Sequence, residues 1–138
     1  MPALTAERDT QRRNGDQAAY PVAAATKIWA GSIACVSTAS PFATKGITAT
    51  TLRAVGVAEE TADNSTGAAG AVLVKVRRTG WHRFTNFATD LIALIDVGAD
   101  CYIVDDQTVA KTSGGATRSI AGVVRDVEPA GVWVEFLK

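Results

Sequence analysis

The sequence AVLVKVRRTGWHRFTNF, residues 71–87, sets the fold class of this chain. In its first half, valines at positions 72, 74 and 76 alternate with Leu73, Lys75 and Arg77. This alternation is the period-2 pattern of a half-buried β-strand over residues 71–78. A short connection, Thr79-Gly80, leads into a second run at 81–87. Two such runs joined by a short glycine-containing turn predict a β-hairpin.

Similar runs recur on both sides of this stretch, separated by Gly, Pro, Asp and Asn turn signals. The final pair is predicted to form a hairpin across Glu128-Pro129. The expected strands outside 71–87 cover residues 26–36, 52–60, 101–105, 118–127 and 130–137. We therefore expect a mainly β fold, a small β-barrel or β-sandwich with a short helical turn.

The helical turn is predicted at Thr89–Val97. Leu91, Leu94 and Ile95 have the i, i+3, i+4 spacing of one helix face, Thr89 can cap the start and Gly98 can end it. A helix this short needs a sheet to pack on.

Residues 1–18 differ from the rest of the chain and are predicted to form an extended N-terminal arm. They are rich in charged residues, and after Met1 their one large aliphatic residue is Leu4. Such a segment buries too little apolar surface to order on its own. The alternatives are a frayed terminus and an arm that orders on a partner. Residues 19–138 are expected to form a single β-rich domain.

Composition narrows the function classes. The 138 residues carry 14 basic and 14 acidic side chains, and 47% are apolar. Domains that bind nucleic acid or anionic membranes through bulk charge carry a basic excess, so neither partner is expected. No apolar run reaches membrane-spanning length and no secretory signal stands at the start, so we expect folding in a cytoplasm. Cys35 and Cys101 are then predicted to be buried, unpaired thiols.

The side chains offer little for catalysis. His82 is the one histidine and is interpreted as a structural or surface residue. Asp105-Asp106 is interpreted as a turn, because an adjacent pair on a strand points to opposite faces. A hard-cation site from Glu60, Asp63 and Asn64 is a weaker alternative. No phosphate-binding glycine loop is present. We predict no catalytic residue, no metal and no cofactor.

The three tryptophans are assigned differently. Trp29 and Trp81 are expected in the core, whereas Trp133 shares its strand face with Glu135 and is the candidate for an oligomer interface. The run Trp81-His82-Arg83-Phe84 is a weak match to a platform for single-stranded nucleic acid, which the neutral charge disfavours.

The chain resembles the structural cement, or capsid decoration, proteins of tailed bacteriophages along nearly its whole length. The matching stretches are runs of fold-specifying sequence, without a catalytic signature. They are Ala6-Glu7-Arg8-Asp9-Thr10, Tyr20-Pro21-Val22-Ala23-Ala24, Val57-Ala58-Glu59-Glu60-Thr61-Ala62-Asp63-Asn64, Cys101-Tyr102-Ile103-Val104-Asp105-Asp106-Gln107-Thr108-Val109, Arg118-Ser119-Ile120-Ala121-Gly122 and Gly131-Val132-Trp133-Val134.

The resemblance implies a β-rich virion protein on the outer surface of the head shell, made in a bacterial host cytoplasm. Such proteins often form trimers, and their partner is the major capsid protein. We expect the arm to contact the shell through Leu4, Arg8, Asp9, Arg12 and Arg13, with the arginines pairing with acidic residues. The alternatives are another virion part, such as a head fibre base, tail or baseplate protein, or a small β-barrel module that binds carbohydrate or nucleic acid. An exposed aromatic cluster would favour the module.

Overall fold

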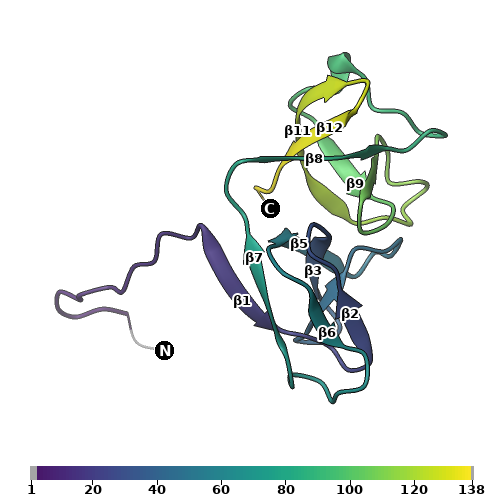
Figure 1. The fold of residues 1–138 in the computed structure, drawn as a ribbon. Helices are drawn as coiled ribbons and strands as arrows, with labels where there is room; N and C mark the ends of the chain where they lie inside the picture. Colours follow the sequence, from purple (N-terminus) through teal and green to yellow (C-terminus); the bar gives the residue numbers. More distant parts are fainter. Residues whose placement is uncertain (1–2, 138) are drawn as a thin grey trace.

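The computed structural model describes residues 3–137, and its strands form three layers (Figure 1). The middle layer is a five-stranded sheet in the order β1 (Gln17–Pro21), β7 (Leu73–Arg77), β5 (Leu52–Ala58), β3 (Ile33–Ser37), β4 (Ala43–Lys45). On one side lies a closed barrel of β10 (Thr108–Ala110), β8 (Trp81–Asn86), β12 (Gly131–Glu135), β11 (Ile120–Glu128) and β9 (Asp100–Ile103). On the other lies a ribbon of β2 (Thr26–Ile28) and β6 (Ala62–Asn64). The mainly β prediction is confirmed.

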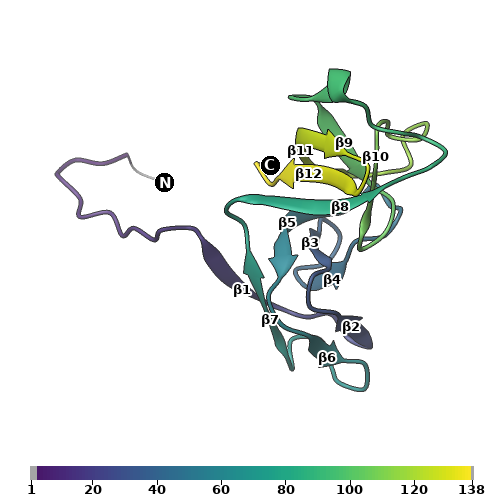
Figure 2. The ribbon, with the colours of Figure 1, turned by 45° about the horizontal axis from the view of Figure 1, so that its top comes forward.

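The hairpin predicted over residues 71–87 is wrong. Both strands exist, but β7 pairs with β1 and β5, and β8 pairs with β12 and β10. Between them the chain turns a corner at Thr79-Gly80, where Gly80 has a φ of +85°. His82 Nε2 lies 3.1 Å from the Thr79 carbonyl oxygen across this corner. The segment therefore passes from the sheet into the barrel (Figure 2).

Two hydrophobic cores occupy the two faces of the five-stranded sheet. Along β3, Ile33 and Cys35 face the barrel core, whereas Ala34 between them faces the β2–β6 ribbon. On β5 the alternation is interrupted, because Ala54 and Val57 both face the barrel side. A bulge in the β3–β5 pairing accounts for this shift, and Gly56 lies in it with a φ of +147°.

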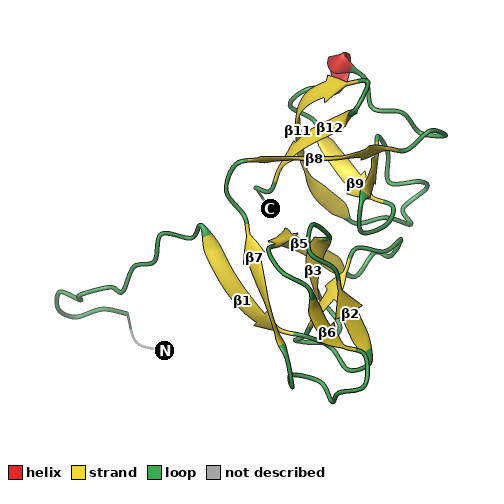
Figure 3. Ribbon diagram, viewed as in Figure 1, coloured by secondary structure: helices red, strands yellow, loops and turns green. Residues whose placement is uncertain are grey.

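Two other predictions need correction. The single strand at 26–36 is two strands, β2 and β3, separated by a turn that Ser32 N closes by donating to the Trp29 carbonyl at 3.0 Å. The helical turn predicted at 89–97 is present but shorter than predicted, because it is one 3₁₀ turn at Leu94–Asp96 and the rest of the segment is loop (Figure 3). The final hairpin is confirmed as β11 and β12. Residues 1, 2 and 138, at the ends of the predicted arm and domain, lie outside the described residues.

We predict that Gly56→Ala destabilises the protein by at least about 2 kcal/mol, because overpacking and backbone strain act together. A Cβ at Gly56 would stand 2.5 Å from the Arg77 carbonyl oxygen, which belongs to the neighbouring strand. The control is Gly115→Ala, at a φ of +74° with nothing within 4 Å, which should cost about 1 kcal/mol. Urea unfolding measures both, and equal losses would show that the close approach at Gly56 does not constrain the sheet.

Candidate functional site: two exposed contact elements

A hollow of about 600 Å³ has no catalytic arrangement in its wall. It lies between β5 and the loop before β11, with apolar side chains such as Leu52 and Ile120 beside Arg53 and Arg118. No histidine, cysteine or carboxylate lines it. Ser119, one of the two serines that line it, donates to the Ala49 carbonyl and accepts from Leu52 N at 3.1 Å. Both hydrogen-bond partners of that hydroxyl are therefore backbone groups.

The residues considered for a cation site have other partners. Asn64 is buried and donates its amide to the carbonyls of residues 22, 23 and 68. Asp63 accepts from Ser65 Oγ at 2.6 Å, and this hydrogen bond holds the pKa of the Asp63 carboxyl below its usual value. Glu60 lies 3.8 Å from Lys75. Within residues 3–137, no group of three His, Cys, Asp or Glu side chains is arranged to hold a metal ion.

Asp105 and Asp106 form a turn, as predicted. Asp105 Oδ1 accepts from Gln107 N at 2.9 Å, and the turn joins β9 to β10.

The N-terminal arm leaves the body at β1 and extends away from it (Figure 1). Its described residues before β1, residues 3–16, are all exposed, and Leu4 retains 72% of its accessible surface. The charged residues singled out in the sequence, Arg8, Asp9, Arg12 and Arg13, make no ion pair with any described residue. β1 begins at Gln17, inside the range predicted for the arm. The arm's side chains are thus available to a partner.

A second exposed element, which sequence reasoning missed, lies at the far end of the barrel. The loop at residues 91–97, the apolar tip, exposes four large aliphatic side chains: Leu91 (59%), Leu94 (64%), Ile95 (88%) and Val97 (46%). Ile92 alone of the tip's large aliphatics is buried, in the barrel core. Clustered exposed aliphatics of this kind mark protein contact sites. In Figure 3 the tip carries the red 3₁₀ turn, well apart from the arm.

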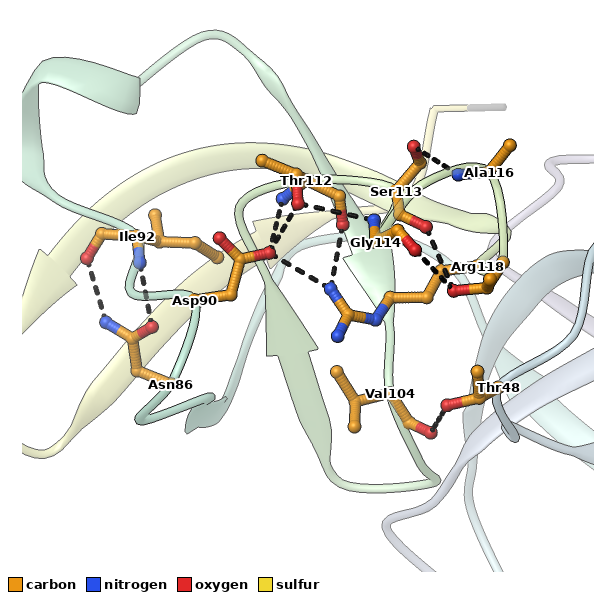
Figure 4. A network of polar contacts seen from close by, with 11 residues as sticks. Thr48, Asn86, Asp90, Ile92, Val104, Thr112, Ser113, Gly114, Ala116 and Arg118 are labelled. Atoms are coloured by element: carbon orange, nitrogen blue, oxygen red, sulfur yellow. Dashed lines mark hydrogen bonds and ion pairs between the residues drawn. The ribbon is translucent and has the colours of Figure 1, made fainter.

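Polar contacts hold the apolar tip in place (Figure 4). The Asn86 side chain makes two hydrogen bonds to the backbone of Ile92. Asn86 Oδ1 accepts from Ile92 N at 2.9 Å, and Asn86 Nδ2 donates to the Ile92 carbonyl at 2.8 Å. Asp96 Oδ2 accepts from Ala93 N at 2.8 Å across the 3₁₀ turn. The aliphatic side chains are therefore presented on a fixed backbone, which reduces the entropy cost of binding.

Asp90 fixes the base of the tip to the loop at 111–118 (Figure 4). Its Oδ2 accepts from Thr112 Oγ1 at 2.6 Å and from Arg118 Nη1 at 3.0 Å. The hydroxyl of Thr112 is the largest cause that lowers the pKa of Asp90, so the carboxylate stays charged down to acidic pH. The Arg118 guanidinium also lies 5.2 Å from the centre of the Phe87 ring.

The prediction that Trp29 and Trp81 lie in the core is wrong. They are 56% and 54% exposed. Trp81 shares the outward face of β8 with Arg83, and Trp29 lies in the turn between β2 and β3. Trp133, the predicted oligomer contact, is partly buried on β12 with the Arg83 guanidinium 5.8 Å from its ring centre. Its role at an interface remains a prediction.

The remaining single residues have structural surroundings. Cys35 and Cys101 are buried and unpaired, as predicted, and burial raises the pKa of each thiol to about 12. His82 is partly buried with its ring 5.7 Å from Phe136, and burial holds its pKa below the usual value.

Comparison of the chain with protein-family models, with curated proteins and with solved structures finds no match in any of the three. In the part of the chain that the structure describes, no helix is long and apolar enough to cross a membrane. The resemblance to decoration proteins therefore remains a sequence-based hypothesis.

We predict that neither thiol reacts with an aromatic disulfide reagent at about pH 8 while the protein is folded, because burial keeps both protonated and covered. Both should react when the chain is unfolded in guanidinium. A colorimetric thiol count before and after unfolding measures this. Stoichiometric reaction of the folded protein would contradict the burial of Cys35 and Cys101.

Proposed function

We propose that this chain is a non-enzymatic structural protein of a virion, which binds the outer surface of a phage head shell and bridges neighbouring major capsid subunits. The observation that carries the proposal is the pair of separate contact elements, the N-terminal arm and the apolar tip. A protein that bridges two subunits needs at least two contact sites that do not overlap. The resemblance of the sequence to the decoration family supports the head shell as the proposed partner.

The two elements supply different kinds of binding energy. Each aliphatic side chain of the tip contributes up to about 1.5–3 kcal/mol when a partner covers it fully. The arm has Leu4 as its one large apolar side chain, and ordering it costs about 1–2 kcal/mol per residue. Arg8, Arg12 and Arg13 must therefore contribute through charged hydrogen bonds to shell carboxylates. Residues 3–16 span at most about 50 Å when extended, so the arm reaches well beyond the body.

A trimer would multiply these contacts. Three copies joined at a subunit interface would present three arms and three tips, and linked weak sites give large avidity. Trp133 is our candidate for that interface, because a large amphipathic ring beside a charged pair suits a subunit contact. Arg83, which lies near this ring, is paired with Glu128 at 3.2 Å.

We predict that loss of either contact element weakens shell binding by about tenfold or more, and that loss of both abolishes it. The variants are a deletion of residues 2–16 and the double substitution Leu94→Ser/Ile95→Ser. Neither should lower the melting temperature, because residues 3–16, Leu94 and Ile95 are exposed. Cosedimentation with shells assembled from the major capsid protein alone measures the binding.

The matched control is Leu73→Ser, which removes an aliphatic side chain that is 61% exposed on the five-stranded sheet, away from both elements. It should bind as the unaltered protein does. Undiminished shell occupancy by both altered proteins would refute the proposal. If shell binding is lost in only one of the two variants, the protein binds the shell through a single element and does not bridge two subunits.

A further inference from the structure

The exposed Trp29 belongs to a turn that is fixed by its backbone. Ser32 N closes the turn on the Trp29 carbonyl at 3.0 Å, and Gly31 N donates to the Ala58 carbonyl at 2.8 Å. Gly31 has a φ of +87°, as the third residue of a type II turn requires. Ala30 N also donates to Thr61 Oγ1 at 3.1 Å. The indole therefore projects from a rigid support.

The turn at residues 105–107 forms the opposite wall of a hollow of about 410 Å³ beside Trp29. It is fixed in the same way, since Ile33 N donates to the Asp106 carbonyl and Thr85 N to the Gln107 carbonyl, each at 2.8 Å. Gly31, in the Trp29 turn, also lines the hollow, and a Cβ placed on it would meet nothing within 4 Å. The hollow is thus open and its walls are set before any ligand arrives.

The polar groups of this hollow have spare hydrogen-bonding capacity. The Asp106 carboxylate is partly exposed and accepts one side-chain hydrogen bond, from Ser32 Oγ at the long distance of 3.5 Å. The side-chain amide of Gln107 is exposed and has no partner among the described residues. A carboxylate acceptor and an amide that both donates and accepts therefore stand near a flat apolar ring.

The charges around the hollow select the class of ligand. Lys27 Nζ lies 3.8 Å from the centre of the Trp29 ring and 3.8 Å from Asp63 Oδ2, so one face of the indole is already occupied by an ion-paired ammonium group. The Asp106 carboxylate repels phosphates. A sugar without charge is not repelled by Asp106, and its ring offers a face of C–H groups to the free side of the indole and hydroxyls to the carboxylate and amide.

We propose that this hollow is a subsite for a neutral carbohydrate, which stacks on Trp29 and donates hydroxyl hydrogen bonds to Asp106, with Gln107 as a second polar contact. A second hollow of about 440 Å³, lined by Trp81 and Trp133, adjoins it at Gly31. The inference does not rest on the proposed binding to a head shell, because it concerns a different surface from the arm and the apolar tip.

The test is calorimetric titration of the full chain with neutral disaccharides of glucose, mannose, galactose and N-acetylglucosamine at millimolar concentration. We expect at least one of them to bind. Trp29→Ala and Asp106→Asn should each weaken that binding by about tenfold or more, which corresponds to loss of a stacking or hydroxyl contact. Melting temperatures should change little, since Trp29 is exposed and the amide oxygen that Asp106→Asn introduces can still accept the long hydrogen bond from Ser32 Oγ.

Trp81→Ala is the matched control, because it removes an equally exposed indole from the adjoining hollow, and it should bind the disaccharide normally. Absence of binding to all four sugars, or equal loss in Trp29→Ala and Trp81→Ala, would overturn the proposal. So would a lower sedimentation mass of Trp29→Ala, which would show that a second copy of the chain covers this surface. None of these results depends on shell binding.

Discussion

The backbone of residues 73–86 must form its hydrogen bonds in two different sheets, and the rest of the molecule is arranged around that requirement. Buried N–H and C=O groups need partners. Because β7 and β8 turn away from each other at Thr79-Gly80, neither strand supplies the other's partners. β7 takes them from β1 and β5, and β8 takes them from β12 and β10. One continuous segment thereby joins the five-stranded sheet to the barrel.

This segment also positions both contact elements. The N-terminal arm enters the fold through β1, which lies along the whole of β7 from Gln17–Arg77 to Pro21–Leu73. The apolar tip follows β8 directly, and Asn86, the last residue of β8, holds Ile92 on both sides. The arm and the apolar tip are therefore attached at separate places to one connected set of strands, β1, β7 and β8 (Figure 2). A force that separates two partners bound at these places would act on the hydrogen bonds that join β7 and β8 to their neighbouring strands.

The sequence predicted the fold class well because period-2 alternation is a local signal. It also located the final hairpin, where β11 and β12 are neighbours in the chain. It failed where the pairing is distant: the partner of Phe84 is Val132, and no turn signal near Gly80 reveals that. The helical turn is shorter than predicted, because Asn86, Asp90 and Asp96 fix the rest of this segment as a loop by side-chain hydrogen bonds.

The binding surfaces were predicted less completely than the fold. The polar composition of the arm indicated an exposed segment. The apolar tip was missed because its Leu91, Leu94 and Ile95 spacing is that of a buried helix face. Trp29 was placed in a long strand, and the type II turn signalled by Gly31 was overlooked. The spacing of Trp81 and Arg83 does predict that these two side chains lie together, since residues two apart on a strand share a face.

We propose that this protein covers a phage head shell by bridging its subunits. The most direct measurement is the molar ratio of this chain to the major capsid subunit in purified virions, by quantitative mass spectrometry. We predict a ratio near one, as lattice-wide coverage requires. A handful of copies per particle would indicate a tail, vertex or fibre component, and absence of the chain from the particle would contradict the account.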